Sequence, residues 1–94
     1  MPIGVLFIEI QIPGCTSLKQ KRSIILSLLA YIHKTYNVSA SEFEKLDSRD
    51  EAILACAVIS NDPTHNRKIL ATISAQISAE RPDLEIVNTK IELL

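Results

Sequence analysis

Residues 4–12 read GVLFIEIQI, and this stretch decides the fold because an apolar residue stands at every second position. Alternation with a period of two residues is typical of a β-strand that buries one face. One face of the predicted strand is wholly apolar, and the other mixes apolar and polar side chains. The apolar face carries Leu6, Ile8, Ile10 and Ile12, and the mixed face carries Val5, Phe7, Glu9 and Gln11.

A long helix is predicted next. Pro13-Gly14 ends the strand, and the hydroxyl of Thr16 or Ser17 can accept hydrogen bonds from the free N–H groups of a helix that begins near Leu18. Apolar residues recur at helical spacing, so we expect an amphipathic helix of about five turns ending near Asn37. Its apolar stripe comprises Leu18, Ile25, Leu28, Leu29, Ile32 and Tyr36.

The middle of the chain contains two more strand signals. Residues 38–43, VSASEF, are predicted as an edge strand, although Ser and Ala are poor strand formers. The charged residues 44–51, EKLDSRDE, are predicted as a hairpin loop, with a helical turn as the alternative. Residues 52–60, AILACAVIS, are apolar on both faces, which indicates a central strand.

A second helix and a last strand complete the pattern. Asp62 can cap the helix and Pro63 suits its first position, so we expect a helix from there to about Glu80. Residues 84–93 alternate again and predict a strand. We expect one face to carry Val87, Thr89, Ile91 and Leu93, and the other to carry Ile86, Asn88, Lys90 and Glu92.

The order β-α-β-β-α-β predicts a ferredoxin-like α+β domain over residues 1–94, with a four-stranded antiparallel sheet and two helices on one face. In this fold the first and third strands are central, and these are the two most hydrophobic strand segments. The register of the third strand stays open. Either of two apolar sets can face away from the helices: Leu54, Cys56 and Val58, or Ile53, Ala55, Ala57 and Ile59.

Composition narrows the class of protein. The 94 residues suit a single domain, and 10 basic against 11 acidic residues give a net charge of −1, so we expect no whole-molecule attraction to nucleic acid or lipid. No apolar run is long enough to span a membrane and no charged secretory start is present, which predicts a cytoplasmic protein. The two cysteines are too few for a disulfide framework.

The sheet face without helices is a candidate interface. Val5 and Phe7 point there with apolar residues of the third strand, and this apolar surface predicts a homo-oligomer, most simply a dimer, or a protein partner. The alternative is a modest surface shielded by neighbouring side chains. Base stacking of the kind seen in RNA recognition motifs is disfavoured because Phe7 is the only aromatic residue expected there.

The start of the first helix is a candidate anion site. Lys19, Lys21 and Arg22 follow Ser17, and free N–H groups at a helix start favour phosphate or RNA backbone. The alternative is that these residues are merely solvated, with Lys21 and Arg22 laying their aliphatic stems over the core.

No catalytic pattern accompanies these features. His33, His65 and Cys15 lack the neighbours that a metal site or nucleophile requires, so we expect no enzymatic activity, no metal and no cofactor. Acylphosphatases share the fold but hold phosphate with an arginine after the first strand, and residues 13–17 contain none. The acidic residues between Glu42 and Glu51 fit a solvated hairpin better than a cation site.

Several segments together resemble the small bacterial YlxP-like proteins, catalogued as a domain of unknown function. They are residues 4–6, 12–14, 17–22, 36–39 and 58–62, of which SLKQKR at 17–22 is the most specific. The resemblance implies a ferredoxin-like fold and a role as a ribosome-binding factor, because such proteins are often encoded beside translation and ribosome-maturation factors. The family's basic stretch matches Lys19, Lys21 and Arg22, whereas its tryptophan-containing segment is replaced by residues 47–51, DSRDE.

Two functions therefore stay open. The first is a non-enzymatic accessory factor that binds ribosomal RNA or a ribosomal subunit through Ser17, Lys19, Lys21 and Arg22. The second is a self-assembling interaction module, or a small-ligand regulatory module, that uses the open sheet face or an edge strand.

Overall fold

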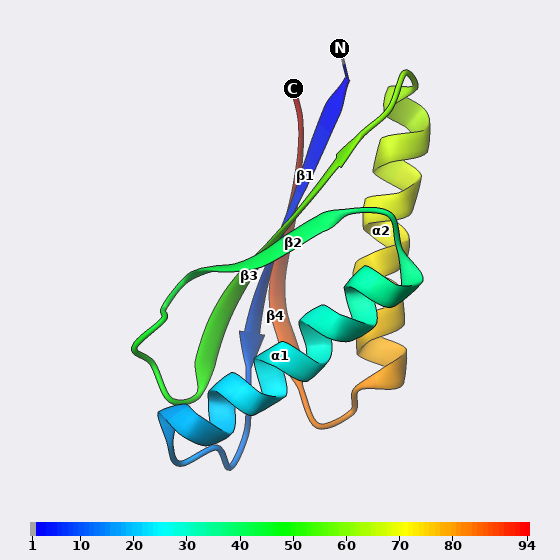
Figure 1. Ribbon diagram of the computed structural model, residues 1–94. Helices are drawn as coiled ribbons and strands as arrows, with labels where there is room; N and C mark the ends of the chain where they lie inside the picture. Colours follow the sequence, from blue (N-terminus) through cyan, green and yellow to red (C-terminus); the bar gives the residue numbers. More distant parts are fainter. Residues whose placement is uncertain (1) are drawn as a thin grey trace.

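The computed structural model describes residues 2–94 and contains one antiparallel sheet of four strands in the order β2-β3-β1-β4, with both helices on one face (Figure 1). This confirms the predicted ferredoxin-like α+β fold, including the central positions of β1 and β3. The elements are β1 (Ile3–Gln11), α1 (Leu18–Thr35), β2 (Ser39–Glu44), β3 (Glu51–Ile59), α2 (Pro63–Glu80) and β4 (Glu85–Leu93).

The two central strands supply most of the core. The predicted apolar face of β1, from Leu6 to Ile12, is buried against the helices. The structure also settles the register of β3, because Leu54, Cys56 and Val58 are buried with it. Pairing of Leu6 with Cys56 and of Phe7 with Ala55 places the other apolar set on the open face. Composition alone allowed either set to be buried, because both sets are apolar.

Both helices begin where their capping residues predict. Ser17 is the N-cap of α1, and its side chain accepts a hydrogen bond from the backbone N–H of Gln20. Asp62 caps α2 by accepting from the N–H of Thr64, and Pro63 occupies the first turn. At the other end α1 stops at Thr35, two residues before the predicted Asn37, because Tyr36 already has extended backbone angles.

Strand β4 departs from the predicted alternation. Glu9 pairs with Asn88 but Ile10 pairs with Ile86, so Val87 is an extra residue in a β-bulge. The bulge reverses the faces on its N-terminal side, and Ile86 rather than Val87 packs against the core. The predicted grouping by face is therefore wrong for these two residues, whereas Thr89, Ile91 and Leu93 share one face as predicted.

The start of β1 and the end of β4 lie together at one end of the sheet, and the α1 start lies at the opposite end (Figure 1). The backbone N–H of Leu94 donates a 2.7 Å hydrogen bond to the carbonyl of Ile3. Over the described residues, neither helix combines the length and hydropathy needed to cross a bilayer.

Candidate functional site

The first turn of α1 is held by reciprocal side-chain hydrogen bonds. Ser17 Oγ accepts from the Gln20 N–H at 3.1 Å, and Gln20 Oε1 accepts from the Thr16 N–H at 3.2 Å. This is a capping box, which fixes the path of the chain into the helix. Among the hydrogen bonds of residues 2–94, none engages the N–H of Leu18 or Lys19. These two donors are directed out of the helix start and are free for an anion.

The structure separates the three basic residues of this turn. Lys21 is only 1% exposed, and its ammonium lies 2.9 Å from Glu42 Oε2 on β2. The same ammonium donates a 2.6 Å hydrogen bond to the carbonyl of Lys45. The predicted anion-binding set of Ser17, Lys19, Lys21 and Arg22 therefore loses Lys21. The ammonium of Lys21 is paired inside the fold and does not reach the surface.

Lys19 and Arg22 remain on the surface. Both are exposed, and they stand three residues apart, so they lie on adjacent turns of one helix face. No ion pair in the described part of the chain engages either of them. Because Lys21 already neutralises Glu42, Arg22 is not required as a counter-ion for that carboxylate.

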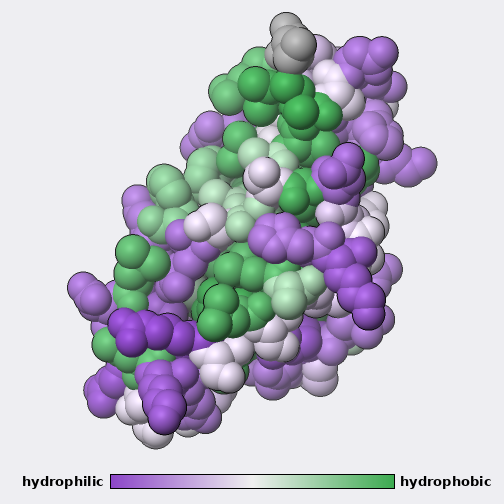
Figure 2. All heavy atoms as spheres, in the orientation of Figure 1, coloured by the Kyte–Doolittle hydropathy of each residue, from purple (hydrophilic) through white to green (hydrophobic). Residues whose placement is uncertain are grey.

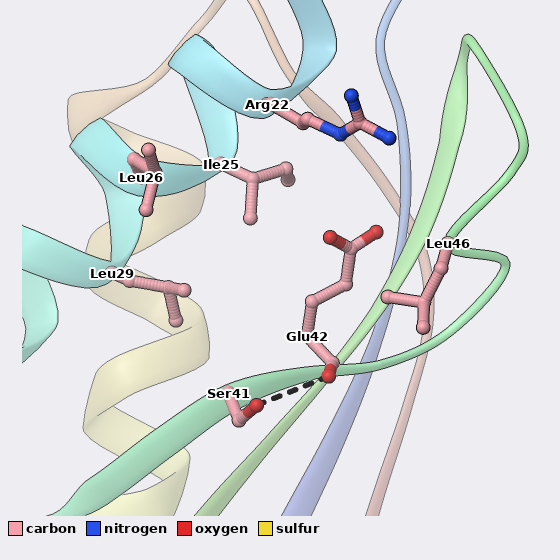
Figure 3. Close-up of a pocket in the computed structure, with 7 residues that line it drawn as sticks. All are labelled: Arg22, Ile25, Leu26, Leu29, Ser41, Glu42 and Leu46. Carbon is pink, nitrogen blue, oxygen red and sulfur yellow. Dashed lines mark hydrogen bonds between the residues drawn. The ribbon is translucent and has the colours of Figure 1, made fainter. Parts of the chain in front are cut away.

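Arg22 also stands at one end of a groove of about 380 Å³ between α1 and β2. In Figure 3 its guanidinium and the carboxylate of Glu42 point toward each other across the groove. Leu26 and Leu29 of α1 and Leu46 of the β2–β3 loop line the rest, and Figure 2 shows hydrophobic side chains among hydrophilic ones on this side of the molecule. The groove is therefore apolar with one charged end, and Arg22 lines that end.

The open sheet face contains an aromatic pair. Phe7 of β1 contacts Phe43 of β2, with ring centroids 5.4 Å apart and planes inclined at 53°. The rings meet across the intervening strand, where Ala55 is small. Phe43 is 52% exposed, and it faces this side because the pairing of β2 is irregular between Glu42 and Glu44. The expectation that Phe7 is the only aromatic residue on this face is therefore wrong, and no sequence signal marks that irregularity.

The charges of the open face are mainly negative. Strand pairing places five glutamates on it against two lysines, which is a local charge of −3. Both lysines are already paired: Lys45 with Glu51 at 2.6 Å and Lys90 with Glu92 at 2.9 Å. Those glutamates are Glu9, Glu44, Glu51, Glu85 and Glu92. This face therefore repels phosphate even though it offers aromatic rings.

The histidines and cysteines have structural surroundings. His33 Nε2 accepts a 3.3 Å hydrogen bond from the backbone N–H of Ala40, which ties α1 to the outer edge of β2. Burial raises the pKa of the Cys56 thiol to about 11, so it stays protonated and unreactive near neutral pH. Cys15 is buried near the start of α1, with its thiol 3.5 Å from the Ser17 carbonyl. No three His, Cys, Asp or Glu side chains in residues 2–94 converge as a metal site would require.

Sheet order, helix placement and the surfaces above define a small ferredoxin-like α+β protein with an open, mostly acidic sheet face and a basic helix start. The chain belongs to the DUF503 family, described as a protein of unknown function, whose model matches residues 3–91. This confirms the YlxP-like resemblance over nearly the whole chain.

Other comparisons bear on the fold alone. Among solved structures, the chain is similar to SnoaB, a cofactor-independent oxygenase from Streptomyces nogalater. The two share a TM-score of 0.51 and 7% sequence identity, over 98% of this chain and 90% of that one. No curated protein matches the sequence.

Proposed function

We propose that the protein is a non-enzymatic, cytoplasmic accessory factor that contacts ribosomal RNA phosphate through Lys19 and Arg22 at the start of α1. The observation that carries the proposal is the combination of two exposed cations, which no ion pair among residues 2–94 engages, and the free N–H groups of Leu18 and Lys19. Positive charge beside helix-start donors is an arrangement that binds phosphate. The YlxP-like resemblance supports a ribosomal partner.

The proposed contact is small, and this decides its expected strength. Two cations neutralise about two phosphates, so the logarithm of the affinity should fall with the logarithm of salt concentration with a slope of about −1.4 to −1.8. A net charge of −1 adds no long-range attraction. Binding should therefore be weak at moderate salt unless a ribosomal protein adds contacts.

The test is co-sedimentation with small ribosomal subunits at low and moderate salt. The variant Lys19→Ala, Arg22→Ala should lose saturable binding and most of the salt dependence. The matched control is Lys34→Ala, Lys68→Ala, which removes the same charge from exposed positions elsewhere on α1 and α2. Equal binding by wild type and the first variant would contradict the proposed site.

A second candidate function is protein docking on the open sheet face. The Phe7–Phe43 pair and the apolar residues of β3 give this face a hydrophobic centre, and the glutamates give it an acidic rim. A partner protein with an apolar centre and a basic rim fits this surface. Two copies stacked face to face would instead bring like charges together, which disfavours self-association through Val5 and Phe7.

The homo-oligomer predicted from Val5 and Phe7 remains a prediction, and Phe7→Asp tests it. If the oligomer forms through the open face, this variant should sediment as a monomer where the wild type does not. The matched substitution Thr72→Asp adds the same charge at an exposed site on α2 and should leave the oligomer intact. A wild-type oligomer that survives Phe7→Asp would contradict the predicted open-face interface.

A further inference from the structure

The outer edge of β4 is free and regular. Gly4 pairs with Leu93, so Ile3 stands opposite Leu94. The backbone N–H of Leu94 donates a hydrogen bond to the carbonyl of Ile3. Backbone hydrogen bonds in an antiparallel pair join directly opposed residues at every second position. Even-numbered residues of β4 after the bulge therefore bond to β1. The odd-numbered residues Thr89, Ile91 and Leu93 direct their N–H and C=O groups outward, where no hydrogen bond within residues 2–94 engages them.

The edge of β2 is closed by comparison. Its outward N–H at Ala40 is donated to His33 Nε2, and the carbonyl of Glu42 accepts from Ser41 Oγ at 3.1 Å. Strand β2 is also shorter, with six residues against nine in β4. Free edges template pairing with another strand, and of the two edges of this sheet β4 offers the longer and less protected one.

The sequence of β4 is complementary to itself in one antiparallel register. When Ile91 opposes Ile91 of a second copy, Lys90 of each copy opposes Glu92 of the other. Both charged side chains are exposed on the same face of the strand. The neighbouring registers that keep odd-numbered residues opposed are shifted by two residues. One of them opposes Lys90 to Lys90, and the other opposes Glu92 to Glu92. Directly opposed like charges destabilise strand pairing, whereas opposite charges stabilise it.

The backbone selects the same register. The bulge at Val87 ends the regular part of β4, which therefore runs from Asn88 to Leu94. Ile91 is the midpoint of this segment, so a two-fold axis at Ile91 uses its full length. In that register the outward residues Thr89, Ile91 and Leu93 of one copy meet Leu93, Ile91 and Thr89 of the other, which gives every free N–H and C=O a partner.

Helix α2 leaves room for the second copy. Helix α2 packs over β1 and β4 whereas α1 packs over β2, so one flank of α2 faces α1, and this flank carries Glu80, whose charge acts on Tyr36. The opposite flank lies on the β4 side of the molecule and carries Arg67 together with the small residues Ala71, Ser74 and Ser78. Across a β4–β4 junction, two α2 helices would face each other through these residues.

We propose that the protein forms a two-fold symmetric dimer in which β4 pairs antiparallel with β4 of a second copy, centred on Ile91, to give one continuous sheet. The interface comprises the strand edges and the small flanks of α2, so its area is near the lower limit for a specific dimer, and we expect micromolar association. The dimer uses neither the α1 start nor the open sheet face, and it places two copies of each in one particle.

The decisive experiment is a charge exchange followed by sedimentation equilibrium. Lys90→Glu opposes four glutamates across the junction and should weaken dimerisation at least tenfold, and Glu92→Lys should do the same with four lysines. An equimolar mixture of these two variants should restore dimerisation, because each then presents the complement of the other. The control Lys34→Glu makes the same charge change on α1 and should leave association unchanged.

A backbone variant tests the strand pairing separately. Thr89→Pro removes an outward N–H that no other described residue engages, so the fold should persist while dimerisation falls at least tenfold. Four results would overturn the proposal. They are a wild-type monomer at several hundred micromolar, unchanged association of Lys90→Glu, no restoration in the mixture, and a dimer lost with Phe7→Asp but kept with Thr89→Pro. The last of these would assign association to the open face.

Discussion

The ammonium of Lys21 lies 2.9 Å from Glu42 Oε2, and this pair joins the first turn of α1 to the edge strand β2 beneath it. The contact is ionic rather than an aligned hydrogen bond, because Oε2 has no hydrogen-bond partner among the described residues. Lys21 also holds the carbonyl of Lys45, whose φ of 63° lies in the left-handed region. A basic residue that looks like part of an RNA-binding motif therefore fixes the path of a hairpin.

Removing one member of this pair should destabilise the fold. Lys21→Met keeps most of the side-chain volume but leaves Glu42, with a side chain 16% exposed, without a counter-charge. We expect a loss of about 3 kcal/mol in the free energy of unfolding, measured by urea denaturation. The double variant Lys21→Met, Glu42→Leu should recover most of it, since no buried charge remains.

Lys19→Met is the matched control, because Lys19 is exposed on the same turn and should change stability by less than about 0.5 kcal/mol. If Lys21→Met were as mild as Lys19→Met, the pair would contribute nothing to the fold.

Gly4→Ala should overpack the contact between β1 and α2. A Cβ at Gly4 would lie 2.9 Å from Leu70 Cδ1 and 3.3 Å from Leu93 Cδ2, and Leu70 is fully buried. We expect a loss of about 1–2 kcal/mol in the free energy of unfolding. In a Leu70→Val background the same substitution should cost about 1 kcal/mol less, because the obstructing methyl group is gone. Equal costs in the two backgrounds would show that the two side chains do not compete for space.

Stability should fall with pH in the alkaline range because of Cys56. Burial raises the pKa of its thiol from 9.0 to about 11, so the folded protein binds this proton more tightly than the unfolded chain does. The stabilising contribution is complete below pH 9 and is lost as pH rises to 11. At about 1.4 kcal/mol per pKa unit, the loss is roughly 2–3 kcal/mol.

Comparison of wild type with Cys56→Ala, both under reducing conditions, isolates this effect. The difference in the free energy of unfolding should be constant up to pH 9 and should shrink above it. A difference that stays constant to pH 11 would exclude the thiol as the cause. The raised pKa of Lys45, which comes chiefly from its hydrogen bond with Glu51, cancels in the comparison.

Asn66→Ala should destabilise the junction between the chain start and α2. Asn66 is fully buried, its Oδ1 accepts a 2.6 Å hydrogen bond from Ser60 Oγ, and its Nδ2 donates to the Pro2 carbonyl at 3.4 Å. Loss of these partners inside the fold should cost about 2 kcal/mol by thermal or urea unfolding. Asn61→Ala, at an exposed position nearby, should be almost neutral. Similar effects of the two substitutions would argue against a specific role for the buried amide.

Periodicity and capping residues were enough to predict the fold. The alternation at residues 4–12 and the Asp62-Pro63 pair predict elements that the structure contains, because each is a local signal. The β3 register was ambiguous, since both faces are apolar and only packing against the helices selects one. The bulge at Val87 has no local signal at all.

The candidate site was harder to predict than the fold. Lys21 stands four residues before Ile25, so helical spacing alone places it on the buried stripe, and this signal could have separated it from Lys19 and Arg22. Its partner Glu42 is distant in sequence, and nothing local pairs them. Phe43 was missed because its orientation depends on irregular pairing in β2. Contacts across elements, rather than local patterns, decide which charged and aromatic side chains remain available.

The closeness of Ile3 and Leu94 has a consequence for rewiring the chain. Because β1 and β4 are antiparallel neighbours with their ends hydrogen-bonded, a short hairpin turn could connect the C-terminal end of β4 to the start of β1. New ends opened between Asp47 and Ser48 would then give a circular permutant with the strand order of the sheet unchanged. In that permutant β2 and β3 would no longer be joined by a hairpin, and Lys21 would hold the carbonyl of a residue near a free chain end.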